Sequence, residues 1–416
     1  MSEYFRVGGA DTDFATAVTF SRSGTAMKIN SLGLLVEVSD GVARRNAYYY
    51  NSSNVLTKGG LLLESAAATN LIANSNSFTS INNGTGTQDA TGPDGTTSAW
   101  TIVDDGSTGS GQVYESESVT VATETTYTAS IFAKADQNNW ITISAIGFTT
   151  PSNSDAFFDL ANGVTGTVDA GIDDARMEYY GNGWWRCSIT FTTDASDTSG
   201  FIRNFVCATD NSTNITLDGT NSVLMYGKQF EEGPIATSYI PTSGSTVTRA
   251  AETLSIAAAD LPYSATAMSI SMKGLMTYAD NGIAIGNGGS GGEVEFYRWT
   301  INNNDYIRAA LDTGSGRIGR VDFVQEASST RDVVSSATDA YSPGYNVPFS
   351  IAARHGSTFI NGAVDGTALT VNETPTALPA LSTTDFQVAP VLNGFVSEFR
   401  MWGTDIGDTG IEEVTA

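Results

Sequence analysis

The feature that most restricts the fold is the near absence of helical periodicity. Short runs that alternate apolar and polar residues stand between turn signals, at spacings of roughly 8–15 residues. In WWRCSITF (184–191), Trp185, Cys187 and Ile189 would share one face of a strand, because successive side chains of a strand point to opposite faces. This pattern predicts an all-β fold of antiparallel β-sandwiches of the jelly-roll type.

The small charged fraction supports the same fold class. Charged residues make up 16% of the chain and hydrophobic residues 40%, so the chain is globular while its surface is covered mostly by Ser, Thr, Asn and Gly. Threonine and aromatic residues favour strands, and Gly and Asn favour turns. The composition is typical of extracellular or virion all-β proteins.

The charge balance excludes two classes of partner. The formal net charge is −25, and the 20 basic residues are scattered, whereas nucleic-acid binding needs patches of Lys and Arg. An acidic surface also disfavours adhesion to anionic membranes. No run of 18 apolar residues and no apolar N-terminal signal segment occurs, so we expect no membrane span and synthesis in a cytoplasm without standard secretion.

Composition shifts divide the chain into three predicted parts. Residues 1–62 offer little room for a core and are predicted to be an attachment segment, residues 63–247 a first jelly roll, and residues 248–416 a second sandwich. The phrase GKQFEEGPIATSYIPTSGSTVTRAAE (227–252) lies at the junction. We interpret it as a structural joint: a closing strand, then an extended connector in which Tyr239 would plug against the first domain and fix the angle between the domains.

Four stretches in a fixed order carry a family resemblance: TFSRSGTAMKINSLGLLVE, GLLLESAAATNLIANSNSF, FFDLANGVTGTV with GNGWWRCSITFT, and MYGKQFEEGPIATSYIPTSGSTVTRAAE. Together they resemble a recurrent module of bacteriophage tail, fibre and head-appendage proteins. The resemblance implies a carbohydrate-binding-module-like jelly roll in the middle of the chain. Further on, FSIAARHGSTFINGAVDG and GFVSEFRMWGTDI are similar to laminin-G or concanavalin-A-like lectin sandwiches.

Catalytic constellations are scarce, and we predict that the chain is not an enzyme and has no catalytic residues. The single histidine, His355, is predicted to lie exposed at a hairpin turn, and no GxSxG nucleophile motif occurs. Glu293 and Glu295 would share a strand face, as the paired carboxylates of a glycosidase do, but a solvated strand face is the simpler interpretation. Cys187 and Cys207 are expected to be buried free thiols, with pairing across a hairpin as the alternative.

No cofactor is expected, apart from calcium. Asp104–Asp105 and Asp173–Asp174 are adjacent acids in predicted loops, and such loops supply oxygen ligands for Ca²⁺. Jelly rolls of the resembled kind often hold a structural Ca²⁺. The spacing of an EF-hand is absent, so the metal-binding residues stay unknown.

Glycan binding requires an exposed aromatic ring to stack on a sugar, with polar groups beside it. Within EYYGNGWWRC the candidates are Tyr179, Tyr180, Trp184 and Arg186, and alternation places Trp184 opposite the core-facing Trp185, as an exposed platform. Packing of the same motif is the alternative interpretation. The second sandwich offers Tyr297 and Trp299.

A cluster of arginine and tyrosine in the N-terminal segment is predicted to dock onto another protein. Such residues are enriched in protein–protein hot spots, and here the candidates are Arg44, Arg45, Tyr48, Tyr49 and Tyr50. The expected partners are other virion proteins (capsid, portal or tail) or neighbouring copies in a homo-oligomer.

The predicted function is therefore that of a non-enzymatic virion surface protein. It would be a tail fibre, head fibre or capsid decoration that adheres to a host surface polysaccharide. The alternatives are a polysaccharide depolymerase and a purely structural decoration protein without a ligand.

Overall fold

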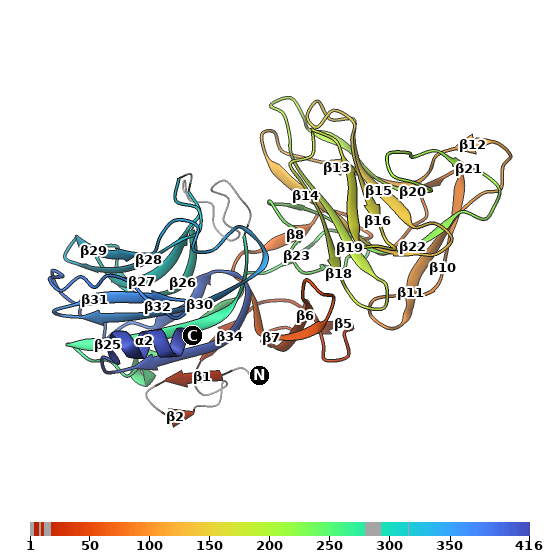
Figure 1. The fold of residues 1–416 in the computed structure, drawn as a ribbon. Coiled ribbons are helices and arrows are strands. Elements are labelled where there is room, and N and C mark those ends of the chain that lie inside the picture. The colour runs from red at the N-terminus through yellow and green to blue at the C-terminus, as the bar shows by residue number, and fades with distance from the viewer. Residues whose placement is uncertain (1–3, 8–9, 12–17, 279–292, 315) are drawn as a thin grey trace.

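The computed structural model describes the whole chain except residues 1–3, 8–9, 12–17, 279–292 and 315. The described residues are nearly all β: the helical elements among them are the 3₁₀ turn η1 (Ala258–Asp260) and the helix α2 (Gly407–Thr415). The prediction of an all-β fold with antiparallel sandwiches is confirmed. Figure 1 shows two sandwiches side by side, joined by a narrower region that contains β8 and β23.

The first sandwich consists of two six-stranded antiparallel sheets. In spatial order, one sheet contains β10 (Gly84–Thr91), β11 (Thr97–Asp104), β22 (Ser222–Glu232), β14 (Thr126–Ala135), β19 (Trp185–Thr192) and β18 (Asp174–Tyr179). The other contains β17 (Val164–Val168), β16 (Ser154–Asp159), β15 (Trp140–Ile146), β20 (Ser199–Cys207), β13 (Val113–Thr120) and β9 (Ile81–Asn82). A short pair, β12 (Ser110–Gly111) and β21 (Ile215–Thr216), lies outside these two sheets.

Alternation along the strands builds the core between these two sheets. Trp185, Cys187, Ile189 and Phe191 of β19 all belong to it, as the period of two predicts. Cys187 and Cys207 are both buried free thiols. They lie on β19 and β20, which belong to opposite sheets rather than to one hairpin, so the prediction of two free thiols is confirmed.

The second sandwich packs a seven-stranded sheet against a larger sheet. Among the described residues, the seven-stranded sheet contains β29 (Thr330–Ser335), β28 (Arg320–Ala327), β27 (Asp305–Asp312), β26 (Glu293–Asn302), β33 (Phe386–Val391), β24 (Thr253–Ile256) and β3 (Thr19–Ser21). The larger sheet runs through β32 (Thr367–Ala368), β31 (Ile360–Val364), β30 (Gly344–Gly356), β25 (Ala267–Tyr278), β34 (Asn393–Trp402), β7 (Leu56–Glu64), β6 (Arg44–Tyr50), β4 (Ala26–Ile29) and β5 (Leu35–Val38). It also includes β1 (Tyr4–Val7), parallel to β34, and β2 (Ala10–Asp11).

The N-terminal strands do not form a separate segment. β3 pairs with β24, and β7 pairs with β34, in the two sheets of the second sandwich. The boundary predicted after residue 62 falls inside β7. The physical reason is that these short strands have too little apolar surface for a core of their own, so they complete the sheets of a sandwich that lies about 200 residues or more further along the chain.

The hairpin of β4 and β5 reaches from the second sandwich to the first. Met27 and Leu35 pack in one buried cluster with Trp184 and Tyr239, and the amide of Leu35 donates to the carbonyl of Pro93 in the jelly roll. The N-terminal strands therefore connect the two sandwiches.

The phrase at residues 227–252 behaves as the predicted joint. β22 carries its first residues, and the chain then runs without regular structure to β23 (Val247–Arg249), which pairs with β8 (Ala68–Asn70). Tyr239 is 1% exposed, and its hydroxyl lies 2.7 Å from Ser75 Oγ. Tyr239 therefore packs against the first sandwich, as the sequence predicted.

One local prediction in the second sandwich is wrong, namely that His355 lies exposed at a hairpin turn. Asn361 and Gly362 lie inside β31, and the turn after this strand falls at Asp365 and Gly366, which have φ angles of 45° and 78°. His355 is fully buried near the end of β30 and hydrogen-bonded to the Tyr297 hydroxyl at 3.0 Å. Burial lowers the pKa of His355 to about 3, so this histidine is a neutral core residue.

Candidate ligand-binding cleft at the joint

A cleft of about 730 Å³ opens where the two sandwiches and the N-terminal strands meet. Its walls come from β4 to β7, from β18 and β19, from the connector at residues 235–239, and from β25, β30 and β34. A volume of this size accommodates a small organic ligand.

Tyrosines from three parts of the chain line the cleft. β6 contributes Tyr48, Tyr49 and Tyr50, the end of β18 contributes Tyr179 and Tyr180, and β30 contributes Tyr345. All six residues are half-buried. The rings have the amphipathic character that sugar recognition requires.

Two of these rings meet across the joint. The centroids of Tyr50 and Tyr179 lie 5.0 Å apart in an edge-to-face arrangement, and Tyr179 in turn packs on Trp185 at 4.9 Å. Gly181 permits this approach: its φ is +84°, and a Cβ at this position would lie 2.2 Å from the Tyr50 hydroxyl oxygen. The GNG turn between β18 and β19 therefore allows the two tyrosine groups to meet.

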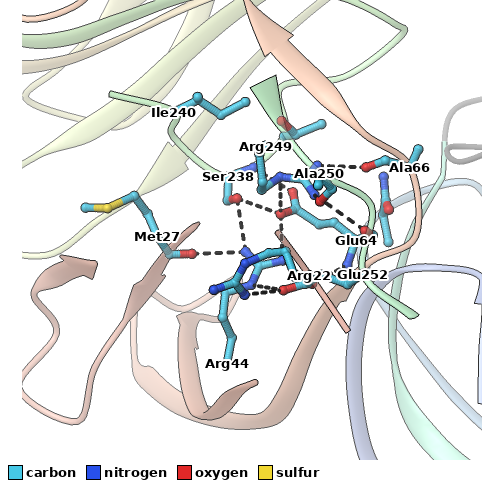
Figure 2. A network of polar contacts seen from close by, with 12 residues as sticks. Arg22, Met27, Arg44, Glu64, Ala66, Ser238, Ile240, Arg249, Ala250 and Glu252 are labelled. Atoms are coloured by element: carbon cyan, nitrogen blue, oxygen red, sulfur yellow. Dashed lines mark hydrogen bonds and ion pairs between the residues drawn. The ribbon is translucent and has the colours of Figure 1, made fainter. Parts of the chain in front are cut away.

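At the side of the cleft that Glu64 lines, a buried network of charges joins the N-terminal strands to the connector and to the residues that follow it, as Figure 2 shows. Glu252 accepts from Arg22 at 2.7 Å and from Arg44 at 2.5 Å. Glu64 pairs with Arg44 at 2.7 Å and with Arg249 at 3.1 Å. Their side chains are 0–6% exposed, so the network fixes one side of the cleft.

The network also anchors the connector. The backbone amide of Ser238 donates to Glu64 Oε1 at 2.7 Å, and the Ser238 hydroxyl donates to Glu64 Oε2 at 2.6 Å. Of the glutamate pair at the start of the phrase, Glu231 is buried and accepts the amide of Thr237 at 2.9 Å. Glu64, Glu231 and Glu252 therefore each accept hydrogen bonds from the connector or from an arginine. Glu232 is exposed.

The network predicts a specific acid sensitivity. Burial alone would raise the pKa of Glu64, but Arg249, Arg44 and the Ser238 hydrogen bonds outweigh it and hold that pKa at about 2. A folded-state pKa below the unfolded value near 4.5 stabilises the fold above pH 4.5, and this contribution, about 3 kcal/mol, is lost as the pH falls toward 2. The difference in unfolding free energy between wild type and Glu64→Gln should therefore shrink as the pH falls through this window. A difference that stays constant from pH 7 to pH 2 would contradict the assignment.

The predicted glycan platforms are mostly buried. Trp184 is 1% exposed and Arg186 2% exposed, so the prediction of Trp184 as an exposed platform is wrong. The hairpin of β4 and β5 and the connector cover the face that alternation assigned to solvent. Tyr297 and Trp299 are fully buried in the core of the second sandwich and cannot stack on an external sugar.

The predicted docking residues divide between the network and the cleft. Arg44 is fully buried, with its guanidinium on Glu64 and Glu252, and is therefore not available to an external partner. Arg45 is half-buried and lies next to it on β6. Two groups that the sequence assigned to different tasks, Tyr48 to Tyr50 and Tyr179 to Tyr180, meet in one cleft.

Two polar residues that line the cleft, Glu178 and Asn393, were not predicted. Glu178 lies half-buried at the edge strand β18, and Asn393, at the start of β34, is 3% exposed. Arg186 occupies the neighbouring strand, donating to Thr237 O and to Ser130 Oγ. The alternation of β18 would have placed Glu178 on the same strand face as Arg176, but nothing in the sequence indicates that Asn393 lies nearby.

The other acidic candidates have partners within the protein. Glu293 and Glu295 both pair with Arg308, at 2.5 and 2.9 Å. Asp104 accepts backbone amides from Asn221 at 2.8 Å and from Gly106 at 3.0 Å. Within the part of the chain that the structure describes, no three His, Cys, Asp or Glu residues gather as a metal-binding group, and no helix there is long and apolar enough to cross a membrane.

Comparisons with known proteins provide no family assignment. No protein-family model and no curated protein sequence matches the chain. Among solved structures, similarity is found to a Ruminococcus gnavus IT-sialidase CBM40 bound to α2,6-sialyllactose, at 12% identity and a TM-score of 0.28, covering 37% of this chain and 85% of that one. A SAP-like pentraxin from Limulus polyphemus gives 7% identity and 0.27, covering 37% and 73%.

A longer alignment is found with domains LG4-5 of the mouse laminin α1 chain, at 10% identity and a TM-score of 0.24, covering 69% of this chain and 85% of that one. At these low scores the assignment of the fold class depends on the strands and sheets described above.

Proposed function

We propose that the chain is a non-enzymatic glycan-binding protein that holds its ligand in the cleft at the joint. The observation that carries this proposal is the gathering of six half-buried tyrosines, from both sandwiches and the N-terminal strands, around one cleft of about 730 Å³. Tyrosine offers a ring face to the apolar side of a sugar and a hydroxyl to its polar edge.

The state of the candidate catalytic groups supports a binding role rather than a hydrolytic one. A glycosidase needs one carboxylic acid to donate a proton and a second carboxylate to act on the sugar. Glu293 and Glu295 both form ion pairs with one arginine, Arg308, so both carboxylates are engaged within the protein. The histidine on which a triad would depend is buried in a core.

From the sequence resemblance over residues 19–252, we also propose where the protein acts. The protein would be displayed on the surface of a bacteriophage particle, as a tail fibre, a head fibre or a capsid decoration, and would attach the particle to a host polysaccharide. Repetition of the subunit about a symmetry axis would multiply a weak interaction with each sugar.

The glycan proposal predicts a loss of binding when the tyrosines are removed. Tyr48→Ala and Tyr345→Ala should each weaken binding to the glycan selected on an array by about tenfold or more. Phe201, an aromatic of β20 that is 43% exposed and does not line the cleft, provides the control variant Phe201→Ala, for which binding should be unchanged.

Titration calorimetry together with thermal melting would separate loss of binding from loss of the fold. Equal affinity for wild type and both tyrosine variants would exclude the cleft as the site. An array without any bound glycan would overturn the glycan-binding proposal itself.

A further inference from the structure

We infer that Glu178 makes the cleft selective for a neutral or amino sugar and excludes acidic sugars such as uronates. The inference depends on the proposed glycan binding and adds the chemical class of the ligand. Its basis is a carboxylate that lines the cleft and forms no hydrogen bond or close ion pair with any described residue.

The orientation of Glu178 follows from the alternation of β18. Ala175, Met177 and Tyr179 pack against the core of the first sandwich, so Arg176 and Glu178 lie on the opposite face of the strand. On that face, the Arg176 guanidinium lies 4.3 Å from the ring centroid of Tyr345 in the second sandwich. Glu178 therefore belongs to the side of β18 that meets the joint.

The two cations beside Glu178 are bound to other acceptors. Arg176 pairs with Asp174. Arg186, which is opposite Glu178 in the strand register, donates to Thr237 O and to Ser130 Oγ. Burial raises the pKa of Glu178, and Arg186 and Arg176 oppose this rise only through space. The carboxylate is partly desolvated without the hydrogen bonds that normally compensate for desolvation.

A second residue of the cleft has a hydrogen-bond donor without an acceptor. Asn393 is 3% exposed, and its Oδ1 accepts the amide of Ser65 at 3.1 Å, whereas its Nδ2 donates to none of the described residues. An unpaired buried donor is uncommon in a folded protein. The cleft thus has one unused acceptor on Glu178, and one unused donor is buried in its wall at Asn393. A sugar hydroxyl group can donate to such an acceptor.

The same arrangement is unfavourable for an anionic sugar. Four charged residues line the cleft: Glu64 and Arg186 are engaged within the protein, Lys28 donates its ammonium to the carbonyl of Arg45, and Glu178 is unpaired. A uronate would place a second carboxylate near Glu178, while the Lys28 ammonium and the Arg186 guanidinium already donate to acceptors within the protein. The net charge of −25 also repels acidic polysaccharides at longer range.

The test compares wild type with Glu178→Gln on three hexasaccharides: β-1,4-linked glucosamine, which is cationic, β-1,4-linked N-acetylglucosamine, which is neutral, and α-1,4-linked galacturonate, which is anionic. The tightest neutral or amino glycan from an array is added as a fourth probe. Glutamine keeps the shape of the side chain but removes its charge. The control variant, Glu232→Gln, removes the same charge from an exposed position outside the cleft.

We expect wild type to bind the cationic or neutral probes more tightly than the galacturonate. Glu178→Gln should weaken that binding by about 10- to 100-fold, the usual effect of losing hydrogen bonds to a charged group, with an unchanged melting temperature. Glu232→Gln should bind as wild type does.

Two results would overturn the inference while glycan binding stands: a wild type that binds galacturonate at least as tightly as the other probes, or a Glu178→Gln variant with unchanged affinity for a bound glycan. If wild type binds none of the four probes, both the inference and the proposed function fail.

Discussion

Replacing Glu252 with alanine is expected to destabilise the protein by about 3–5 kcal/mol, the usual cost of breaking a buried ion pair by removing one partner. Glu252 accepts from Arg22, from Arg44 and from the backbone amide of Glu64. Without it, Arg22 would lose its one ion pair with a described residue, in a position that is 3% exposed.

Calorimetry provides the measurement, since a loss of this size lowers the melting temperature by on the order of 10 °C in a domain of this length. Glu252→Gln keeps the volume of the side chain and can be measured if the alanine variant does not fold. Glu37→Gln, on the exposed face of β5, is the matched control and should melt as wild type does. A melting temperature of Glu252→Ala that equals the wild-type value would show that the network does not stabilise the joint.

Trp184→Ala is expected to cost about 3–5 kcal/mol as well, because it removes a large aromatic side chain from a closed cluster. Trp184 is 1% exposed and packs in one cluster with Met27 and Leu35 of the N-terminal hairpin and with Tyr239 of the connector. The loss should therefore release the hairpin from the first sandwich and deform the cleft beside it.

Limited proteolysis and urea unfolding would both detect this change, and Trp184→Phe should have an intermediate effect. Leu32→Ala, at a side chain that is 75% exposed in the turn between β4 and β5, is the control. A Trp184→Ala variant with unchanged stability and reduced glycan binding would contradict the structure. It would instead support the prediction from alternation that Trp184 is an exposed residue that stacks on a sugar.

The two predictions concern one part of the molecule. The charge network joins the N-terminal strands to the connector, and the cluster around Trp184 joins both of these segments to the first sandwich. The cleft lies where these segments meet, so its shape depends on contacts that do not themselves touch a ligand. Variants of the joint should change affinity and stability together, whereas Glu178→Gln should change affinity alone.

Alternation in the sequence was enough to predict much of the first sandwich. In WWRCSITF it placed Trp185 and Cys187 correctly in the core, because the side-chain period of a strand is a local property of the backbone. The joint was also predictable in outline, since Pro241 and a polar run indicated an extended connector and Tyr239 is the one aromatic residue between β22 and β23.

The same reasoning failed for the opposite face of that strand. Alternation shows which residues share a face, but it does not show what covers that face. Trp184 and Arg186 point away from the sandwich core and are nevertheless buried, because the connector and the N-terminal hairpin lie over them. Burial there depends on a connector about 50 residues away and a hairpin about 150 residues away, and no local pattern encodes such contacts.

By itself, the sequence determined the all-β class, the alternation within strands and the place of the joint, all of which follow from local backbone geometry. Only the tertiary structure decided that the N-terminal strands complete the second sandwich, that Arg44 pairs with Glu252 across 208 positions, and that two tyrosine groups line one cleft. These outcomes depend on which distant surfaces bury each other, and that choice is made by packing and charge pairing over the whole chain.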